Sequence, residues 1–367
     1  MLNQDRTDQF IDQVLDAIAN NTPINIVGGN SKHFLGRSQP ANSLNAIEHS
    51  GVISYEPTEL VVTVRAGTSM QSLNALLLDH GQMLPFEPPV LGAGTIGGVL
   101  ACGLSGPARP FAGAARDYVL GMRVINGQAQ ALRFGGEVIK NVAGYDAARL
   151  QVGAYGTLGV LLETSMKVLP LPEAQITIHH ELSQTNDTTG IVRLMRQPLP
   201  ITAAAIVGHM QYIRLSGSEA AVKAAAKACG GERLKEDALF WQSIREHTHA
   251  FFNDVRPLWR ISVPEFTGAM DIDGEWLLDW AGSQRFLKSD VPATDIYAAA
   301  LSADGHATCY SPSMLPAATP LFQPLNGTMQ RLQARVRDSF DAKRLFNRGR
   351  FHPELDTDSL AVAATEN

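Results

Sequence analysis

Apolar residues recur at helical spacing near both ends of the chain. Near the N-terminus Phe10, Val14 and Ile18 share one face of a 3.6-residue repeat, which predicts a surface helix. The segment 69–81 repeats leucines in the same way, with Gly81 as the expected C-terminal cap. The segment 329–340 predicts a second amphipathic helix close to the C-terminus.

Short β-branched and apolar runs between these helices predict strands. The run INIV at 24–27 ends on two glycines, and LVVTVRAG at 60–67 leads into the helix at 69–81. The runs 118–127 and 130–136 predict a hairpin, with a type I′ turn at Asn126-Gly127. The run 156–170 predicts one long strand that Pro170 and Pro172 close.

That proline pair predicts a domain boundary, because the sequence before it is rich in glycine and its pattern changes after it. Strands and helices alternate after it, and they predict an α+β sheet with helices on one face. The run 275–287 is expected to be one of its strands. We therefore expect a first domain at 1–172, a second at 173–325, and a C-terminal helix and strand at 326–367 that end in a frayed tail.

Composition predicts a globular protein, since 45% of the residues are hydrophobic and 18% are charged. The net charge of −6 and the scattered Lys and Arg residues argue against nucleic-acid binding. The sequence has neither a secretory signal pattern nor a membrane-spanning run, which favours a cytoplasmic protein. Cys102, Cys229 and Cys309 lie far apart without CxxC spacing, so we expect reduced thiols and no iron–sulfur cluster.

Three glycine-rich segments precede the predicted boundary, namely VGGNSKHFLGR, GAGTIGGVLACGLSGPARP and KNVAGYDAARLQVGAYGTLGV. None of them has the GxxxxGK[ST] spacing of a Walker A motif. Consecutive N–H groups of a glycine turn hold phosphate oxygens well, so the first segment predicts a diphosphate loop. The alternative is an ordinary polar loop between a strand and a helix. In the second segment Thr95 and Ser105 add hydroxyl donors, and Ile96 is expected to pack beneath a flat ring.

In order and spacing, these segments together with VRAGTSMQSLNALLLDHGQMLPFEPP and RFGGEVIKNVAGYD resemble the PCMH-type FAD-binding domain of the vanillyl-alcohol oxidase family. Within that family the chain is most similar to the FAD-binding subunits of bacterial glycolate oxidases. That likeness continues through LWRIS, DWAGSQRFLKS, GHAT and LFNRGR. The resemblance implies an α+β fold, in which a two-lobed PCMH-type FAD-binding domain is followed by an α+β cap domain over the flavin.

Cofactor-binding residues follow from the resemblance position by position. It implies that the pyrophosphate loop consists of Gly28, Gly29, Asn30, Ser31 and Lys32. It implies that the segment lying along the flavin and the ribityl chain consists of Gly94, Thr95, Ile96, Gly97 and Gly98. Further positions expected near FAD are Ser105, Gly106, Asp117, Gly156, Gly159, Val160 and Asn347.

Two further points concern whether a covalent bond holds the flavin and whether a positive charge lies beside it. His33 is placed for the covalent flavin bond that some members of the wider family have, but the subfamily resemblance implies noncovalent FAD. A second motif near the flavin or the substrate comprises Lys140, Asn141, Tyr145 and Asp146. A lysine beside the flavin would stabilise the reduced ring, whereas the plain alternative for this motif is a solvated turn.

Oxidation of a 2-hydroxy acid needs a cation for the carboxylate and a base for the hydroxyl proton. The cap candidates are Arg260 and His306, although a structural arginine and a loop histidine are equally consistent with the sequence. No carboxylate stands at a supporting spacing beside the pair His179 and His180, so no metal site is expected. The histidine-rich EHG-type motif of the related catalytic subunits is absent from the sequence.

The expected function is therefore that of an FAD-dependent oxidoreductase acting on CH–OH, as a subunit of a glycolate oxidase complex. The resemblance implies a second FAD-binding catalytic subunit and an iron–sulfur subunit as partners, and through them a peripheral place at the inner membrane. Two alternatives remain at this point. One is an independent flavin dehydrogenase or reductase for another small substrate, and the other is a scaffold subunit without catalysis.

Overall fold

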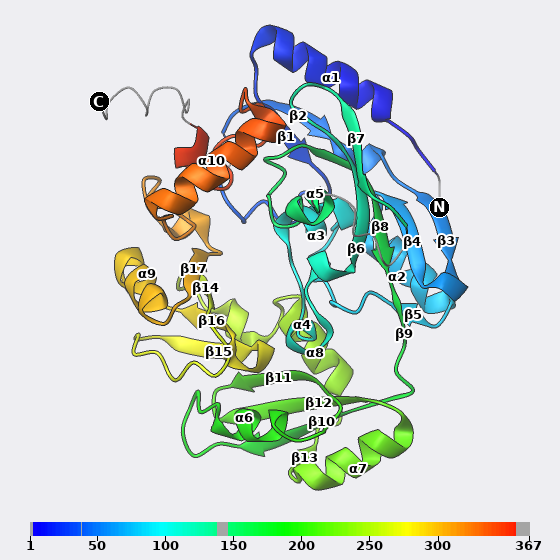
Figure 1. Cartoon of the computed structure of the whole chain (residues 1–367). Coiled ribbons are helices and arrows are strands. Elements are labelled where there is room, and N and C mark those ends of the chain that lie inside the picture. Colours follow the sequence, from blue (N-terminus) through cyan, green and yellow to red (C-terminus); the bar gives the residue numbers. More distant parts are fainter. Residues whose placement is uncertain (1–2, 38, 138–145, 357–367) are drawn as a thin grey trace.

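The computed structural model describes residues 3–37, 39–137 and 146–356 (Figure 1). Three sheets carry the architecture, a parallel pair, a five-stranded sheet and an eight-stranded sheet. The predicted roles of Lys140, Asn141 and Tyr145 lie outside the described residues. Asp146 is described, and its carboxylate accepts a hydrogen bond of 3.0 Å from the N–H of Arg149 at the start of a short helix.

The N-terminal helix covers the parallel pair of strands. These elements are α1 (Thr7–Asn20), β1 (Ile24–Val27) and β2 (Asn42–Asn45). The predicted face of α1 is confirmed, because Phe10 and Val14 are buried in a core that they share with Ile24 and Phe346. The parallel pair ends where β1 runs into the glycine loop that begins at Gly28.

The second lobe is an antiparallel sheet in the order β3-β4-β8-β6-β7. Its strands are β3 (Val52–Glu56), β4 (Val61–Arg65), β6 (Val119–Ile125), β7 (Ala131–Gly135) and β8 (Val160–Lys167). Helices α2 (Met70–Asp79) and α3 (Ile96–Cys102) share its core. The shorter elements of this lobe are β5 (Gln82–Met83), α4 (Arg109–Ala112), α5 (Ala147–Leu150) and β9 (Leu169–Pro170).

Two local predictions in this lobe are wrong. The β6–β7 connection is not a two-residue turn at Asn126-Gly127, because pairing ends at Ile125 and resumes at Ala131. The Asn126 side chain accepts hydrogen bonds from two backbone N–H groups within the loop, which stabilises the longer connection. The run 156–170 is not one strand either, since β8 ends at Lys167 and β9 pairs with β5.

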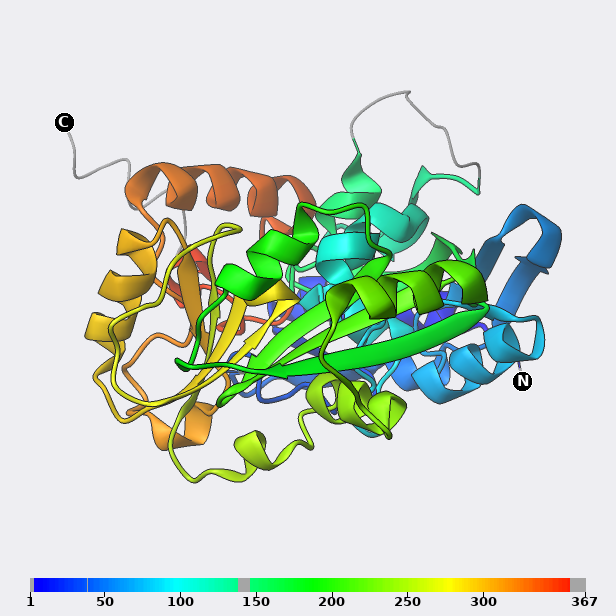
Figure 2. The same ribbon diagram turned by 90° about the horizontal axis from the view of Figure 1, so that it is seen from below.

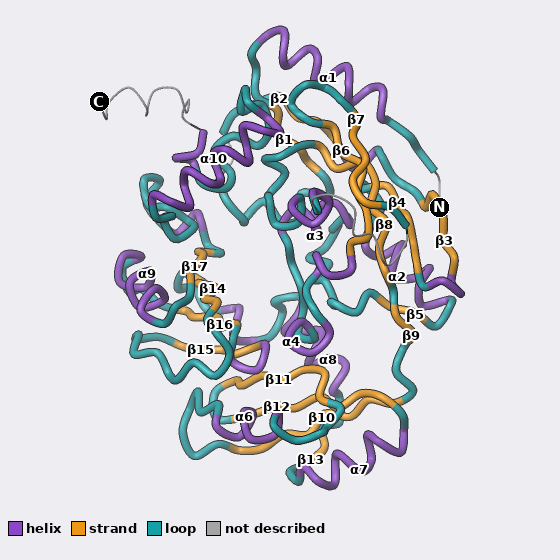
Figure 3. Tube along the Cα trace, viewed as in Figure 1, coloured by secondary structure: helices purple, strands orange, loops and turns teal. Residues whose placement is uncertain are grey.

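The chain leaves this lobe after β9 and enters the eight-stranded sheet at β10 (Figure 3). The sheet is antiparallel in the order β13-β10-β12-β11-β15-β16-β14-β17. Its strands are β10 (Ala174–Glu181), β11 (Ile201–Val207), β12 (Met210–Gly217), β13 (Glu232–Arg233), β14 (Leu258–Ser262), β15 (Glu275–Asp279), β16 (Gln284–Lys288) and β17 (His306–Cys309). The single strand expected at 275–287 is thus a hairpin, β15–β16, whose turn begins at Trp280. We call this sheet with its helices the cap.

Helices lie on both faces of the cap sheet, so the expectation of helices on one face is wrong (Figure 2). One face packs against α6 (Thr189–Met195), α7 (Glu219–Cys229) and α9 (Ala293–Ser302). The other face packs against α8 (Asp237–Arg245). Small alanines in β11 make room for this, because Ala204 faces the first group of helices while Ala203 and Ala205 pack on Trp241 of α8.

Polar contacts fasten the cap to the lobes before it. The Glu246 carboxylate accepts hydrogen bonds from the N–H groups of Val90, at 3.0 Å, and Leu91, at 2.8 Å. Arg214 of β12 forms a largely buried ion pair with Glu87, with an N–O distance of 2.8 Å. These contacts fix the cap beside the segment that leads into α3.

The C-terminal segment returns to the first lobe, where α10 (Gly327–Asp341) lies across it (Figure 1). After α10, Leu345 and Phe346 enter the core around β1. The N–H of Asn347 donates to the carbonyl of Ile24, at 2.9 Å, which places this residue beside the glycine loop. No helix in the described ranges is long and apolar enough to span a bilayer.

Candidate functional site

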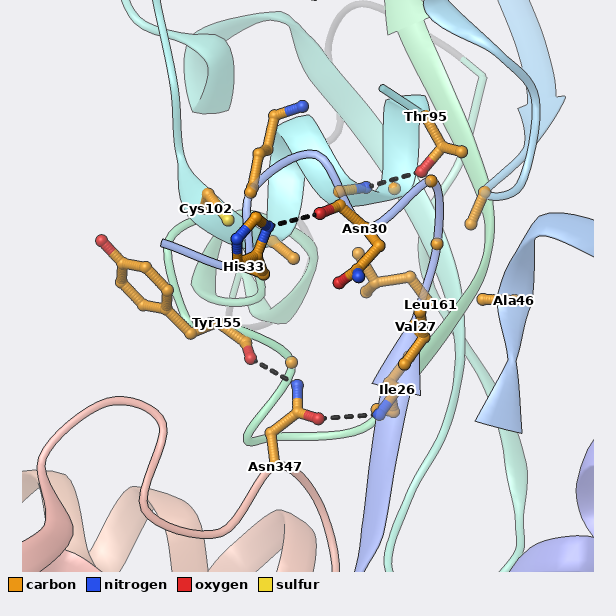
Figure 4. Close-up of a pocket in the computed structure, with 18 of the residues that line it drawn as sticks. Ile26, Val27, Asn30, His33, Ala46, Thr95, Cys102, Tyr155, Leu161 and Asn347 are labelled. Carbon is orange, nitrogen blue, oxygen red and sulfur yellow. Dashed lines mark hydrogen bonds between the residues drawn. The ribbon is translucent and has the colours of Figure 1, made fainter. Parts of the chain in front are cut away.

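The loop after β1 presents a row of unpaired backbone donors. Within the described part of the chain, the N–H groups from Gly29 to His33 make no hydrogen bond to protein. Asn30 has a positive φ of 52°, and this left-handed conformation bends the loop at this residue (Figure 4). Successive free N–H groups on such a turn form a concave anion site. The loop lines a cavity of about 90 Å³ together with Thr95, Gly97, Gly98 and Asn347.

The glycines of this loop serve contacts between protein segments. A Cβ on Gly29 would lie 1.6 Å from the carbonyl oxygen of Ala93, and one on Gly28 would lie 2.7 Å from the Thr95 hydroxyl. A Cβ on Gly97 would lie 2.8 Å from both the Cβ and the carbonyl oxygen of Ala66. Bare backbone was expected here so that a ligand could approach. In the structure the missing side chains instead let the loop pack against the segment before α3, which holds its N–H groups in place.

Two basic residues stand at this loop. Lys32 is only 5% exposed, and its Nζ lies 3.2 Å from the Ser31 hydroxyl and 3.4 Å from the carbonyl oxygen of Val90. Burial lowers the pKa of this ammonium group. The Arg350 guanidinium donates to the carbonyl of Lys32 at 2.9 Å, and Arg350 also lines the cavity. The loop therefore combines N–H dipoles with two cations, as a diphosphate requires.

The predicted residues around α3 are divided between the cavity and the core. The Thr95 hydroxyl caps α3 by accepting from the N–H of Gly98, at 3.2 Å, and Thr95 lines the cavity. Gly94 lies behind it, facing the carbonyl of Val90. Ile96 is fully buried among the apolar residues of the second lobe and does not line the cavity, so its packing beneath a flat ring stays a prediction.

The C-terminal segment closes the cavity through Asn347. Its side chain accepts a hydrogen bond from the N–H of Ile26, at 2.8 Å, and donates one to the carbonyl of Tyr155, at 2.7 Å (Figure 4). Gly156 and Gly159 line the same cavity, whereas Val160 is buried in the core of the first lobe. Three segments distant in sequence thus meet at one amide side chain.

A second cavity, of about 380 Å³, lies between the lobes and the cap. It adjoins the first, since Cys102 and Tyr155 line both. The two predicted catalytic residues, Arg260 and His306, both line it. Desolvation by the surrounding protein and the charges of Arg260 and Arg109 lower the pKa of His306. His306 is therefore neutral near pH 7 and able to accept a proton.

A chain of side chains orients Arg260. Its Nε donates to the Gln284 side-chain oxygen at 2.5 Å, and the Gln284 amide nitrogen lies 3.3 Å from a carboxylate oxygen of Asp279. The other Asp279 oxygen accepts from the N–H of Trp280, at 2.8 Å. The buried carboxylate thereby sets which end of the Gln284 amide faces the guanidinium.

Asp279 makes stability depend on pH. Burial raises its pKa to about 7, and the nearby charge of Glu87 acts in the same direction. Between about pH 4 and 7 the folded chain keeps a proton that the unfolded chain has lost, so this group lowers stability as pH rises through that window. We expect the difference in unfolding free energy between the wild type and Asp279→Asn to fall by about 2 kcal/mol from pH 5 to pH 7. Urea unfolding at both pH values measures it, and a difference that stays constant contradicts the raised pKa.

The remaining predicted positions lie apart from the two main cavities. The Ser105 hydroxyl accepts from the N–H of Ala115, at 3.0 Å, and Gly106 accepts the indole N–H of Trp280, at 2.9 Å. Both line a small adjoining cavity beside Arg260. Asp117 is exposed, and its carboxylate accepts from the N–H of Ala114, at 2.8 Å, which is a local turn contact. The structure does not bring Asp117 to these cavities.

Sequence reasoning missed several residues of the second cavity, namely Arg109, Tyr155, Trp280, Phe322 and His352. Arg109 lies in the second glycine-rich segment, and the only sign of its role in the sequence was its charge within that segment. The others come from both sides of the predicted domain boundary, and no local pattern joins them. No group of three or more metal-ligating side chains occurs among the residues that the structure describes.

Comparisons with known proteins agree with this geometry. A family described as FAD binding domain matches residues 5–135. The chain is 45% identical to the glycolate oxidase subunit GlcE of Escherichia coli (strain K12), over 96% of this chain and 99% of that protein. It is 33% identical to the glycolate oxidase subunit GlcD of Bacillus subtilis (strain 168), over 35% of this chain and 27% of that protein. An alkyldihydroxyacetonephosphate synthase shares the fold, with a TM-score of 0.65 at 14% identity, over 92% of this chain and 73% of that one.

Proposed function

The chain belongs to the family of the glycolate oxidase subunit GlcE, and on that premise we propose that it is the FAD-binding subunit of a complex that oxidises glycolate to glyoxylate. The observation that carries the proposal is the adjacency of two cavities. One has the donors for a diphosphate, and the other has a cation and a neutral histidine suited to a 2-hydroxy acid.

FAD fits the first cavity by the chemistry of its donors. Its diphosphate would be held by the free N–H groups of the loop from Gly29 to His33, with Lys32 and Arg350 supplying positive charge. Asn347 would hold the walls of the cavity together from the C-terminal side. When bound, FAD supplies the acceptor for the hydride that leaves the hydroxyl-bearing carbon.

The second cavity would hold the substrate. Arg260, oriented by Gln284, would bind the carboxylate, and His306 would take the hydroxyl proton as the hydride leaves. Trp280 and Phe322 would exclude part of the water from this space, since both line it. Glycolate would thus lose a proton to His306 and a hydride to FAD, and the loss of both would leave glyoxylate.

We propose that FAD is held without a covalent bond. The Nδ1 atom of His33, the histidine placed nearest the loop, lies 3.0 Å from the carbonyl oxygen of Asn30. Its ring is therefore engaged with the backbone of its own loop (Figure 4). A denatured sample should release all of its flavin into the supernatant, and flavin that stays with the precipitated chain contradicts this.

The partners proposed are a second FAD-binding catalytic subunit and an iron–sulfur subunit. The name of the Escherichia coli relative, a glycolate oxidase subunit, supports a multi-subunit complex. The three cysteines of this chain are free, and no group of three or more metal-ligating side chains occurs among the described residues, so electrons would leave through another protein. A peripheral place at the inner membrane would follow from such partners.

Anaerobic reduction by glycolate tests the proposed function. The full chain, reconstituted with FAD, is mixed with glycolate alone and again after co-expression with its neighbouring subunits. Bleaching of the flavin bands of the chain alone supports the proposal, and so does bleaching in the complex of more flavin than the second FAD-binding subunit holds. A chain that binds FAD but is never bleached by glycolate, while another small alcohol or acid bleaches it, indicates an independent dehydrogenase of a different substrate. A chain that binds no FAD indicates a scaffold subunit.

A further inference from the structure

Three arginines, Arg109, Arg116 and Arg260, give the second cavity an excess of positive charge. Two histidines, His306 and His352, also line it, and burial lowers the pKa of both. No aspartate or glutamate is among the described residues of its lining. Like charges repel one another in a partly desolvated space, so an anion bound among these arginines would be stabilised.

Two of these cations meet over one indole ring. The guanidinium carbon of Arg109 lies 4.2 Å from the centroid of Trp280, and that of Arg260 lies 5.1 Å from the same centroid. The indole is fixed in place, because its N–H donates to the carbonyl of Gly106 at 2.9 Å. Burial and the charges of Arg260 and Arg116 lower the pKa of Arg109. Trp280 therefore brings together one cation from each side of the interface.

The two guanidinium groups differ in how they are bound. Arg260 belongs to β14 of the cap and donates to Gln284. Arg109 belongs to α4 of the second lobe, and within the described residues its guanidinium has no hydrogen bond and no ion pair. Among the described residues, therefore, nothing occupies its donors, while Arg260 is already oriented. Paired guanidinium groups with free donors are the protein partners that carboxylates prefer.

We propose that Arg109 is a further substrate-binding residue, which joins Arg260 to bind the carboxylate of a small 2-hydroxy or 2-oxo acid across the interface between the lobes and the cap. This inference rests on the proposed function and adds to it the ligand's class and a second cation from the flavin side of the cavity. Neither lobe nor cap alone would hold the anion, so substrate binding would depend on their docking. The neutral analogue of such an acid would lack the interaction on which both arginines depend.

Binding of oxalate to the full chain reconstituted with FAD tests this inference. Isothermal titration calorimetry follows oxalate binding to the wild type, to Arg109→Gln and to Arg109→Lys, with quenching of tryptophan fluorescence as a second signal. We expect the glutamine variant to bind oxalate at least about tenfold more weakly, and the lysine variant to recover part of the loss. The matched control is Arg335→Gln, an exposed arginine on α10 outside the cavity lining, which should bind as the wild type does. Uncharged oxamide should not bind.

Two results overturn the inference. One is an Arg109→Gln variant that keeps its FAD and binds oxalate as tightly as the wild type. The other is a wild-type holoprotein that binds no oxalate, or that binds oxamide equally well. Failure of the proposed function gives a different pattern, because then the wild type either lacks FAD or is not bleached by glycolate with or without its partners. A wild type that is bleached by glycolate, with bleaching unaffected in Arg109→Gln, therefore rejects substrate binding by Arg109 and leaves the proposed function standing.

Discussion

Replacing Gly29 with alanine is expected to abolish FAD binding. A Cβ at this position would lie 1.6 Å from the carbonyl oxygen of Ala93 and 2.6 Å from its carbonyl carbon. Both atoms belong to backbone, which cannot rotate away as a side chain can. The loop from Gly29 to His33 must then move away from the segment before α3, and its N–H groups lose the arrangement that suits a diphosphate. We also expect the variant to lose about 1–3 kcal/mol of stability from overpacking.

The flavin retained per chain after reconstitution and removal of free FAD measures this effect. The matched control is Gly136→Ala, because a Cβ there meets nothing within 4 Å and its φ is not positive. That variant should keep the flavin content and melting temperature of the wild type. A Gly29→Ala protein that binds FAD as well as the control does would show that the loop does not hold the cofactor.

The Asn347→Ala variant is expected to be destabilised by about 3 kcal/mol. Asn347 is 4% exposed, and its side chain satisfies the N–H of Ile26 and the carbonyl of Tyr155. Alanine leaves these two partly buried backbone groups without their partners. The residue also has a positive φ of 44°, a conformation that asparagine tolerates better than alanine does.

Urea unfolding measures the loss. Asn20→Ala serves as the control, since this exposed residue makes a single local hydrogen bond to Asp16 on α1 and should change the unfolding free energy by a few tenths of a kcal/mol. The Asn347 variant should also bind FAD more weakly, because β1 and the loop at Tyr155 are no longer tied together. Equal stability of the two variants would contradict the bridging role.

The local elements of this fold were predictable because each rests on a short periodic pattern. The face of α1 was expected from neighbouring residues alone and is confirmed. Gly81 was expected to cap α2, but the cap is His80, and Gly81 takes the left-handed conformation one position beyond it. The glycine loop was also predicted, but the contact that requires its glycines was not. The atom that Gly29 makes room for, the Ala93 carbonyl, lies 64 positions further along the chain. A sequence pattern does not reveal such a contact.

The parts that were missed depend on contacts between distant segments. Asn126-Gly127 suits a tight turn by itself, yet the Asn126 side chain and the packing of Gly127 against Asp341 favour a longer loop. Helix α8 covers the second face of the cap sheet because alternate alanines of β11 leave room there. The guanidinium groups of Arg109 and Arg260 lie over the same Trp280 ring only because α4 docks on the turn that carries Trp280. In each case tertiary packing decides between options that the local sequence leaves equal.

The visible absorption spectrum of the purified full chain tests the central claim most directly. The chain is reconstituted with FAD, freed of unbound cofactor, and compared with the Gly29→Ala variant treated in the same way. The account predicts flavin bands in the wild type at about one FAD per chain, and their loss in the variant. A wild-type chain that shows no flavin bands after reconstitution would contradict it.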